Sequence, residues 1–420
     1  MMIFRIQGIN RFDRAIFILL VSLLFGGLGG YLTPCRIVTI FYVPLLLKCF
    51  NCKQLHVKNI TYCFFVFYLY CAVSFLWTPD KVQGAKELIY YPIHILYFLE
   101  IVVFSKLSAN PLKSIALGWT INILLSSLLG LYEIITDVHF SIGVDQQSDR
   151  IMNFGHIQVL QRFARVFYAN YNTFNTVITF ALPFITYYIL KYPSNKCLRR
   201  IAAITYFLST IIVITNGSRG GILSIILITA SVIMLTKSSR EKNIMVFTLC
   251  VMFMFIFYYF YTEIFTIIEM RISEGNIYED DTRSNLIKLG IQICIDSVGF
   301  GSGVGSVQAK LGLLNKGGIT ITHNMFIELL SQYGILFTVI FMLFILKLFK
   351  RIRYIIDQNR RAILYSSFVS MPFYMVIDSG YLLYPQLYAL FASLYIYCTH
   401  NPRSVDYTSK ETITSIHLNT

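Results

Sequence analysis

The chain has 420 residues, of which 56% are hydrophobic and only 13% are charged, and its mean hydropathy is +0.63. This composition excludes an ordinary water-soluble domain, because so few charged residues cannot cover the surface of a chain of this length. The formal net charge is +14. The basic residues gather between apolar blocks, a pattern that argues against nucleic-acid binding and is typical of the positive-inside bias of membrane proteins.

The apolar residues recur in blocks of roughly 16 to 25 residues, the length that crosses the hydrocarbon core of a bilayer. We therefore predict an all-α integral membrane protein with about 12 transmembrane helices. The first block lacks a small-residue cleavage site, so we expect a retained span and not a removed signal peptide. The predicted spans are 14–32, 35–50, 59–77, 88–105, 114–136, 170–190, 200–215, 220–236, 244–262, 324–349, 362–377 and 381–399.

The basic residues also predict the orientation of the chain. They are dense in 191–200 and 347–361, which we assign to the cytoplasm together with both termini. This orientation puts two long loops outside, 137–169 and 263–322, the second between spans nine and ten. Within it, residues 284–298 have an amphipathic helical pattern, which predicts a helix that lies on the membrane surface.

We expect one polytopic domain over residues 1–399, followed by a tail. The tail, residues 400–420, is rich in Thr and Ser and poor in apolar residues, so we predict that it is disordered and cytoplasmic.

Cysteine and acidic residues give little support for a metal centre or a disulfide framework. The nine cysteines lie mostly within or beside predicted spans, and the lone CxxC motif of Cys49 and Cys52 lacks the further ligands of a zinc site. The acidic run Glu279, Asp280 and Asp281 can bind a divalent cation, since hard cations prefer clustered carboxylates. We expect no cofactor and no metal.

A short external hairpin, residues 216–221, has the composition of an anion site. It reads Asn-Gly-Ser-Arg-Gly-Gly, and Arg219 stands where the next span begins. Ser218, Gly220 and Gly221 allow close backbone approach at a helix N-terminus, and a guanidinium suits phosphate. The alternative is a simple turn with one solvated charge. An Arg on the translocated side runs against the positive-inside bias, which favours the functional interpretation.

The start of span six carries further candidates for substrate binding. Residues 168–175 alternate Asn with aromatic residues, a composition that can hydrogen-bond and stack a sugar. Asn172 and the preceding Arg165 are therefore candidate substrate-binding residues. A helix cap with an interfacial aromatic belt explains the same stretch equally well.

The last candidates lie at the two ends of the second outer loop. Arg283 comes just before the amphipathic helix, and His323-Asn324 stands at the mouth of span ten. Two guanidiniums and one imidazole on the same face match a lipid-linked diphosphate and a hydroxyl that must lose its proton. The simpler interpretation is that His323 and Asn324 only cap a membrane helix.

Between them lies a glycine-rich run, residues 299–305. Its spacing does not match a dinucleotide-binding motif, and no buried strand precedes it. It can form a flexible backbone collar near phosphate or sugar, or a plain loop.

Taken in order, these motifs resemble the O-antigen ligase and O-antigen polymerase superfamily of bacterial membrane glycosyltransferases. The resemblance is carried by Ser218 to Gly221, Arg283 with the following helix and glycine-rich run, and His323-Asn324 with Glu328 and Gly334, and extends to Asn170 to Pro183 and Trp77 to Asp80.

This resemblance implies an inverting, metal-independent transfer of a glycan from an undecaprenyl diphosphate carrier to a glycan or lipid A core acceptor. The reaction would occur at the outer face of the bacterial cytoplasmic (inner) membrane, with membrane lipid as a further partner. Arg219 and Arg283 would hold the diphosphate, and His323 would act on the acceptor hydroxyl.

Two other functions fit parts of the same pattern. Polymerisation of repeat units uses the same donor and leaving group as ligation, so the motifs do not separate the two, and we prefer the ligase-like interpretation only slightly. A flippase or exporter of lipid-linked oligosaccharide is the alternative that is not an enzyme. The predicted spans hold few interior charges, mainly Glu100 and Glu133, and no repeated broken helices, which argues against transport.

Overall fold

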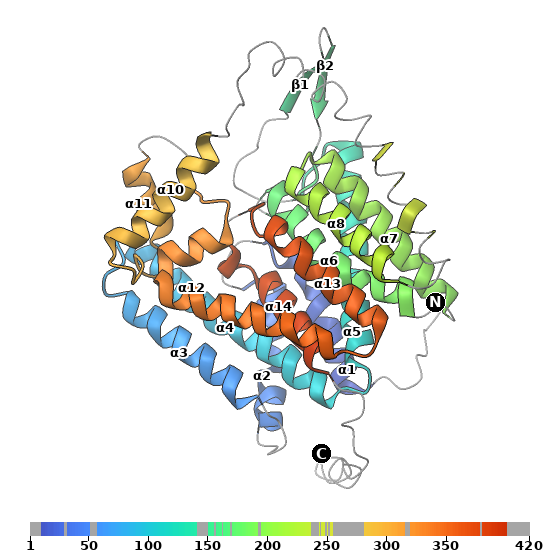
Figure 1. The fold of residues 1–420 in the computed structure, drawn as a ribbon, viewed down its shortest axis with the longest axis horizontal. Coiled ribbons are helices and arrows are strands. Elements are labelled where there is room, and N and C mark those ends of the chain that lie inside the picture. Colours follow the sequence, from blue (N-terminus) through green and yellow to red (C-terminus); the bar gives the residue numbers. More distant parts are fainter. Residues whose placement is uncertain are drawn as a thin grey trace.

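The computed structural model describes residues 10–28, 32–50, 57–140, 150–154, 157–161, 163–168, 170–191, 195–236, 281–315, 320–378 and 380–400, with isolated residues between 243 and 254. These residues form a helical bundle and one two-stranded antiparallel hairpin (Figure 1). The helices of the first half are α1 (Arg11–Ser22), η1 (Leu23–Phe25), α2 (Pro34–Phe50), α3 (Lys58–Ser74), α4 (Lys81–Leu107), α5 (Pro111–Thr136), α6 (Tyr171–Lys191), α7 (Lys196–Thr215) and α8 (Arg219–Leu235).

The described part of the second half continues with five α-helices and two short 3-10 helices. Its helices are α10 (Asp281–Asp296), α11 (Val307–Leu314), α12 (Met325–Arg351), η2 (Ile352–Tyr354), α13 (Gln358–Tyr374), η3 (Tyr381–Leu383) and α14 (Pro385–Thr399). The hairpin consists of β1 (Arg150–Phe154) and β2 (Ile157–Gln161), with Ile151 opposite Leu160. These strands lie in the loop 137–169, where the sequence pattern predicted no regular structure.

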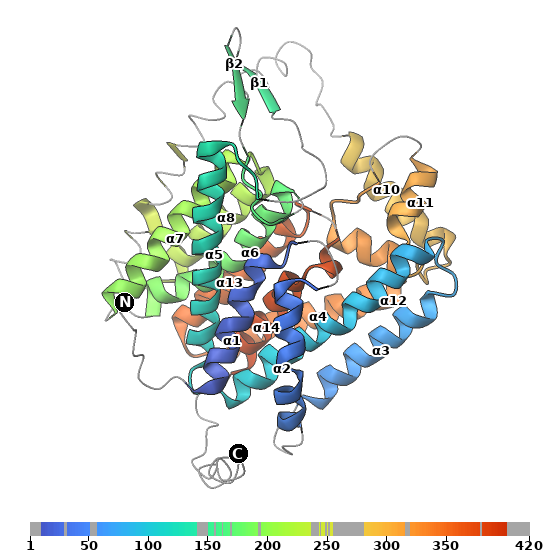
Figure 2. The same cartoon turned by 180° about the vertical axis from the view of Figure 1, so that it is seen from behind.

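The helices fall into two groups that α1 and α14 join (Figures 1 and 2). On one side α3, α4 and α12 lie together, with α10 and α11 packed at their ends; on the other lie α5, α6, α7, α8 and α13. Among the described residues, five helices (α4, α5, α6, α7 and α12) are long and apolar enough to cross a bilayer. The chain is therefore a multi-pass membrane protein. The predicted span 244–262 lies largely outside the described residues, as do Cys52, Glu279, Asp280 and the tail after residue 400.

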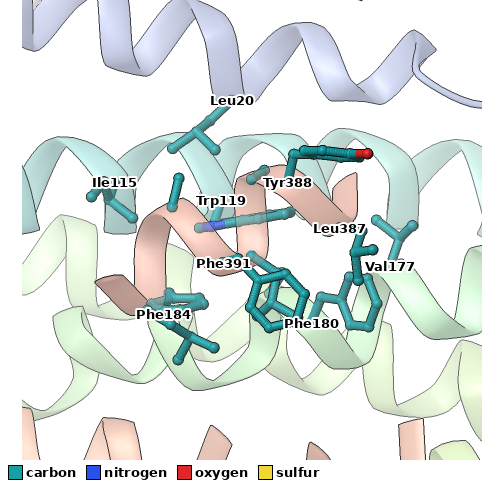
Figure 3. Close-up of a cluster of buried hydrophobic side chains, with 14 of the residues drawn as sticks. Leu20, Ile115, Trp119, Val177, Phe180, Phe184, Leu387, Tyr388 and Phe391 are labelled. Atoms are coloured by element: carbon teal, nitrogen blue, oxygen red, sulfur yellow. The ribbon is translucent and has the colours of Figure 1, made fainter. Parts of the chain in front are cut away.

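Close packing and interhelical hydrogen bonds hold the bundle together. Figure 3 shows Trp119 of α5 surrounded by apolar side chains from several helices; its ring stacks on Phe184, with centroids 6.3 Å apart, and its Nε1 donates to Ser393 Oγ at 3.0 Å. A Cβ on Gly118 would lie 2.6 Å from Leu20 Cβ, so α1 and α5 approach closely because this residue is glycine. Such small residues and polar bridges are the usual contacts between helices in lipid, where apolar burial alone gives little preference.

The glycine-rich run 299–305 is a packing element between α12 and the corner that joins α3 to α4. Four of its consecutive backbone N–H groups donate to acceptors of the protein itself. The pairs are Ser302 to Ser331 O (2.8 Å), Gly303 to Gln332 O (3.0 Å), Val304 to Ser74 Oγ (3.1 Å) and Gly305 to Glu87 Oε2 (3.0 Å). Since these amides are engaged, the run is not a backbone collar for phosphate or sugar.

Helix α12 is kinked where this run packs against it. Gly334 has φ 78° and ψ −177°, and a Cβ there would lie 2.2 Å from Gly299 O. Only glycine tolerates both the dihedral angles and the contact. The buried Glu87 fixes the same region, because its Oε2 accepts from Gln332 Nε2 at 2.5 Å and from Tyr91 OH at 2.6 Å. The first half of α12, at whose start His323 lies, is thereby held to α4.

Candidate functional site

Helix α12 begins with the capping geometry that the simpler interpretation predicted. The side chain of Asn324 accepts from the backbone N–H groups of Phe326 (3.0 Å) and Ile327 (3.2 Å), which satisfies two donors at the start of the helix. His323 precedes this cap with φ 47°, a left-handed conformation that is uncommon for a non-glycine residue and is found often at functional sites. The backbone conformation therefore sets the direction in which the side chain of His323 leaves the start of α12.

The imidazole of His323 is half-buried next to a positive charge. Burial lowers its pKa below the ordinary 6.5, the nearby charge of Arg283 lowers it further, and the backbone of Ile377 acts in the opposite direction. Its Nδ1 is buried and has no hydrogen-bond partner among the described residues. Arg283, an exposed residue in the first turn of α10, is thus close enough to His323 to affect its charge.

The hairpin before α8 packs against the end of α13 and the residues that follow it, which include Ile377. A Cβ on Gly220 would lie 3.0 Å from Ile377 Cγ1 and 3.4 Å from Phe373 O, so this glycine allows the two segments to approach. Ser218 caps the helix by accepting from Gly221 N at 3.3 Å. Arg219 is exposed at the first position of α8.

Ile377 therefore lies between two of the predicted positions, since it contacts Gly220 beside Arg219 and also the imidazole of His323. Arg283 in turn lies near His323. The structure brings together three segments that are far apart in the sequence: the start of α8, the start of α10 and the start of α12. Arg219, Arg283 and His323, which were predicted to hold the diphosphate and to act on the acceptor hydroxyl, belong to these segments.

The start of α6 has the contacts of a helix cap with packed aromatic residues. Asn170 accepts from Thr173 N at 2.8 Å, and Phe163 stacks on Tyr171 with ring centroids 4.8 Å apart. Asn172 is half-buried in the first turn of α6. The aromatic residues of this stretch that stack do so on other rings of the protein. This agrees with the alternative interpretation from the sequence, a helix cap with an interfacial aromatic belt in place of sugar stacking.

Arg165 lies in the short segment 163–168, before α6, and is half-buried. The backbone of this segment is bonded to α5 through Glu133 and to the hairpin before α8 through Asn216. The segment therefore reaches the hairpin that carries Arg219.

Sequence reasoning did not single out Asp378, and it quoted Glu328 only as part of the family resemblance. Glu328 and Asp378 are both buried; Glu328 Oε2 accepts from Gly380 N at 2.8 Å, and Asp378 Oδ2 accepts from Thr173 Oγ1 at 2.5 Å. Asp378 directly follows Ile377, so α6, α12 and the loop after α13 meet here. The available signal was Asp378, an acidic residue in the short segment between the predicted spans 362–377 and 381–399.

No set of three or more His, Cys, Asp or Glu side chains within the described part of the chain is arranged to hold a metal ion. Of the two stretches that the sequence analysis considered for a metal, the CxxC motif and the acidic run, Cys52, Glu279 and Asp280 lie outside the described residues.

Residues 204–342 match the family model of the O-antigen ligase domain. This range contains Arg219, Arg283 and His323. Over 292 residues the chain is also 22% identical to the teichuronic acid biosynthesis protein TuaE of Bacillus subtilis (strain 168). That similarity covers 67% of this chain but only 58% of the relative, so the chain spans somewhat more than half of the length of that protein.

Proposed function

We propose, on the premise that this chain belongs to the O-antigen ligase and O-antigen polymerase superfamily, that it transfers a glycan from an undecaprenyl-diphosphate-linked donor to a sugar hydroxyl. The observation that carries the proposal is a chain of contacts: Gly220, next to Arg219, packs against Ile377, the backbone of Ile377 contacts the imidazole of His323, and the charge of Arg283 acts on that imidazole. Two guanidiniums and a deprotonated imidazole are the groups that this reaction needs.

In this mechanism the acceptor oxygen attacks the anomeric carbon while the bond from that carbon to the diphosphate oxygen breaks. His323 takes the proton of the acceptor hydroxyl, and its lowered pKa keeps the ring unprotonated and able to accept at neutral pH. Arg219 and Arg283 hold the diphosphate and stabilise the negative charge that it gains as it leaves. A direct displacement of this kind inverts the anomeric centre, and the guanidiniums take the role that a metal ion has in other transferases.

The same proposal includes the topology. Twelve spans with both termini in the cytoplasm would put the starts of α8, α10 and α12 at the outer face, where a lipid-linked glycan on the outer leaflet can reach them. The positive-inside bias of 191–200 and 347–361 supports this orientation. The agreement between predicted apolar blocks and helices supports the spans that fall on described residues.

Ligation to a separate acceptor, such as a lipid A core, and polymerisation of repeat units are both compatible with this site. The matched family is described as O-antigen ligase, which favours the first. The relative takes part in teichuronic acid biosynthesis, so an acceptor other than a lipid A core stays a second candidate, and with it polymerisation. The two reactions share the donor, the leaving group and the three residues, and they differ only in the acceptor.

The experiment is a transfer assay with purified protein and a synthetic lipid-linked repeat unit, with and without a candidate acceptor. The proposal predicts release of lipid diphosphate by the wild type and none by His323→Ala. Lengthening of the donor alone identifies a polymerase, and transfer only when an acceptor is added identifies a ligase. Arg353→Lys is the matched control for Arg219→Lys, because Arg353 is also exposed but follows the far end of α12. Full transfer by His323→Ala would remove His323 from the mechanism.

A further inference from the structure

A buried carboxylate holds the segment that carries Arg165. Glu133, in the last turn of α5, is 0% exposed. Its Oε2 accepts from the N–H groups of Arg165 and Val166, both at 2.7 Å, and its Oε1 accepts from Phe140 N at 2.9 Å. One side chain thereby fixes both ends of the outer loop that leaves α5 and returns to α6.

The backbone of this segment is strained where the carboxylate binds it. Val166 has φ 53°, a left-handed conformation that a β-branched residue rarely adopts. Two consecutive N–H groups that converge on one oxygen form a small anion-binding concavity, and here Glu133 supplies the anion. The strain persists because the carboxylate and the turn from Arg165 O to Tyr168 N (2.9 Å) fix the backbone on both sides of Val166.

A second buried side chain connects the segment to the hairpin before α8. Asn216 accepts from Ala164 N at 2.8 Å, donates to Ala164 O at 3.0 Å, and donates to Asn175 Oδ1 at 2.8 Å. Its amide therefore pairs with the backbone of Ala164 as a neighbouring strand would. Ala164 directly precedes Arg165, and Asn216 stands three residues before Arg219, so the side chain of Asn216 bonds the segment of Arg165 to the hairpin of Arg219.

We propose that Glu133 and Asn216 are positioning residues that hold Arg165 beside Arg219, and that Arg165 is a third guanidinium for the diphosphate of the donor. This inference rests on the proposed function. Glu133 and Asn216 do not touch the substrate; they act through the place that they give to Arg165.

The chemistry of the leaving group gives the third guanidinium a distinct role. A diphosphate that is bonded to a lipid at one end and to a sugar at the other carries two negative charges. When the bond to the anomeric carbon breaks, its electron pair goes to the diphosphate oxygen, which adds a further negative charge. All three guanidiniums stabilise the charge that develops, and Arg219 and Arg283 already balance the two charges of the bound donor. The contribution of Arg165 therefore falls mainly on the transition state.

This role predicts that the loss of Arg165 lowers kcat and has little effect on KM. Arg165→Ala should lower kcat by about 100-fold, the usual effect of losing one donor to a developing anion, and leave KM for the donor within about twofold, because an interaction made only in the transition state does not contribute to substrate binding. Asn216→Asp places a carboxylate oxygen against Ala164 O and Asn175 Oδ1 and should lower kcat in the same way. Glu133→Gln should do so as well, since a neutral amide is a poorer acceptor for three N–H groups.

The test is a set of transfer assays on the purified full-length variants, with Ser126→Ala as the matched control. Ser126 is buried on α5, as Glu133 is, but within the described part of the chain its hydroxyl donates to Asn122 Oδ1 of the same helix (3.4 Å) and to no other segment. If Asn216 acts through Arg165, the double variant of Arg165→Ala and Asn216→Asp should be no slower than the slower single variant, whereas two independent defects would multiply.

Each outcome is distinguishable. A wild type that transfers no glycan refutes the proposed function itself. An active wild type with an Arg165→Ala variant of equal kcat overturns the inference alone, and this variant keeps the test valid even if Asn216→Asp or Glu133→Gln fails to fold. If the losses of kcat in the two single variants multiply in the double variant, the role of Arg165 stands and the positioning role of Asn216 is overturned.

Discussion

Replacing Gly334 by Ala should release the first half of α12 from the glycine-rich run 299–305. At φ 78° and ψ −177° the residue lies in a region that is essentially restricted to glycine, which costs another residue roughly 1–3 kcal/mol. The new Cβ would also lie 2.2 Å from Gly299 O, the atom that accepts from Ile335 N at 2.9 Å. Loss of that hydrogen bond adds about 1 kcal/mol, so we expect a destabilisation of about 2–4 kcal/mol.

The assay is the fraction of monodisperse protein that remains in detergent after heating, measured over a series of temperatures. Gly312→Ala is the control, because a Cβ at Gly312 in α11 meets nothing closer than Thr320 Cγ2 at 3.6 Å, and alanine is the better helix former. Gly334→Ala should lower the midpoint by several degrees and Gly312→Ala should not. Equal midpoints for Gly334→Ala and wild type would refute the packing role of the kink.

Five further outcomes follow from the proposed function and topology. Arg219→Lys should lose transfer although it keeps the charge, since lysine lacks the bidentate fork; wild-type rates would count against diphosphate binding. Because the pKa of His323 is lowered, the acid limb of kcat/KM in the wild type should lie below pH 6.5. Arg283→Gln removes a positive charge that lowers this pKa, so the limb of its residual activity should move to higher pH, and an unchanged limb would contradict the coupling. Transfer should survive EDTA, and strict dependence on an added divalent ion would instead support metal binding by the acidic run 279–281. Reporter fusions at positions 195, 275 and 355 should read inside, outside and inside, and any other order breaks the proposed topology.

The helices of this protein could be predicted because a membrane span is a local property. About 20 apolar residues in a row specify a helix, whichever other helices surround it. The same holds for the cap of α12, which needs only Asn324 and the two residues that follow it closely. The hairpin of β1 and β2 was not predicted, since its short segments lie in a long polar loop with no strong alternation.

The polar contacts could not be predicted in the same way, because they join residues that are far apart in the sequence. Asn216 bonds Ala164 across 52 positions, and Asp378 bonds Thr173 across 205. Glu133 was noticed only as a charge inside a predicted span, and its partners are backbone groups that no sequence pattern identifies. The glycine-rich run was ambiguous for the same reason: its purpose depends on Gly334 and Glu87, which a linear pattern does not connect to it.

The central claim is that this membrane protein breaks a sugar–diphosphate bond at its outer face. The most direct measurement is the fate of a lipid-linked repeat unit in vesicles that contain the purified wild type or His323→Ala. The account predicts free lipid diphosphate and a longer or transferred glycan with the wild type, and neither product with His323→Ala. Intact lipid-linked glycan that only changes leaflet, at equal rates for both proteins, would identify a flippase and contradict the account.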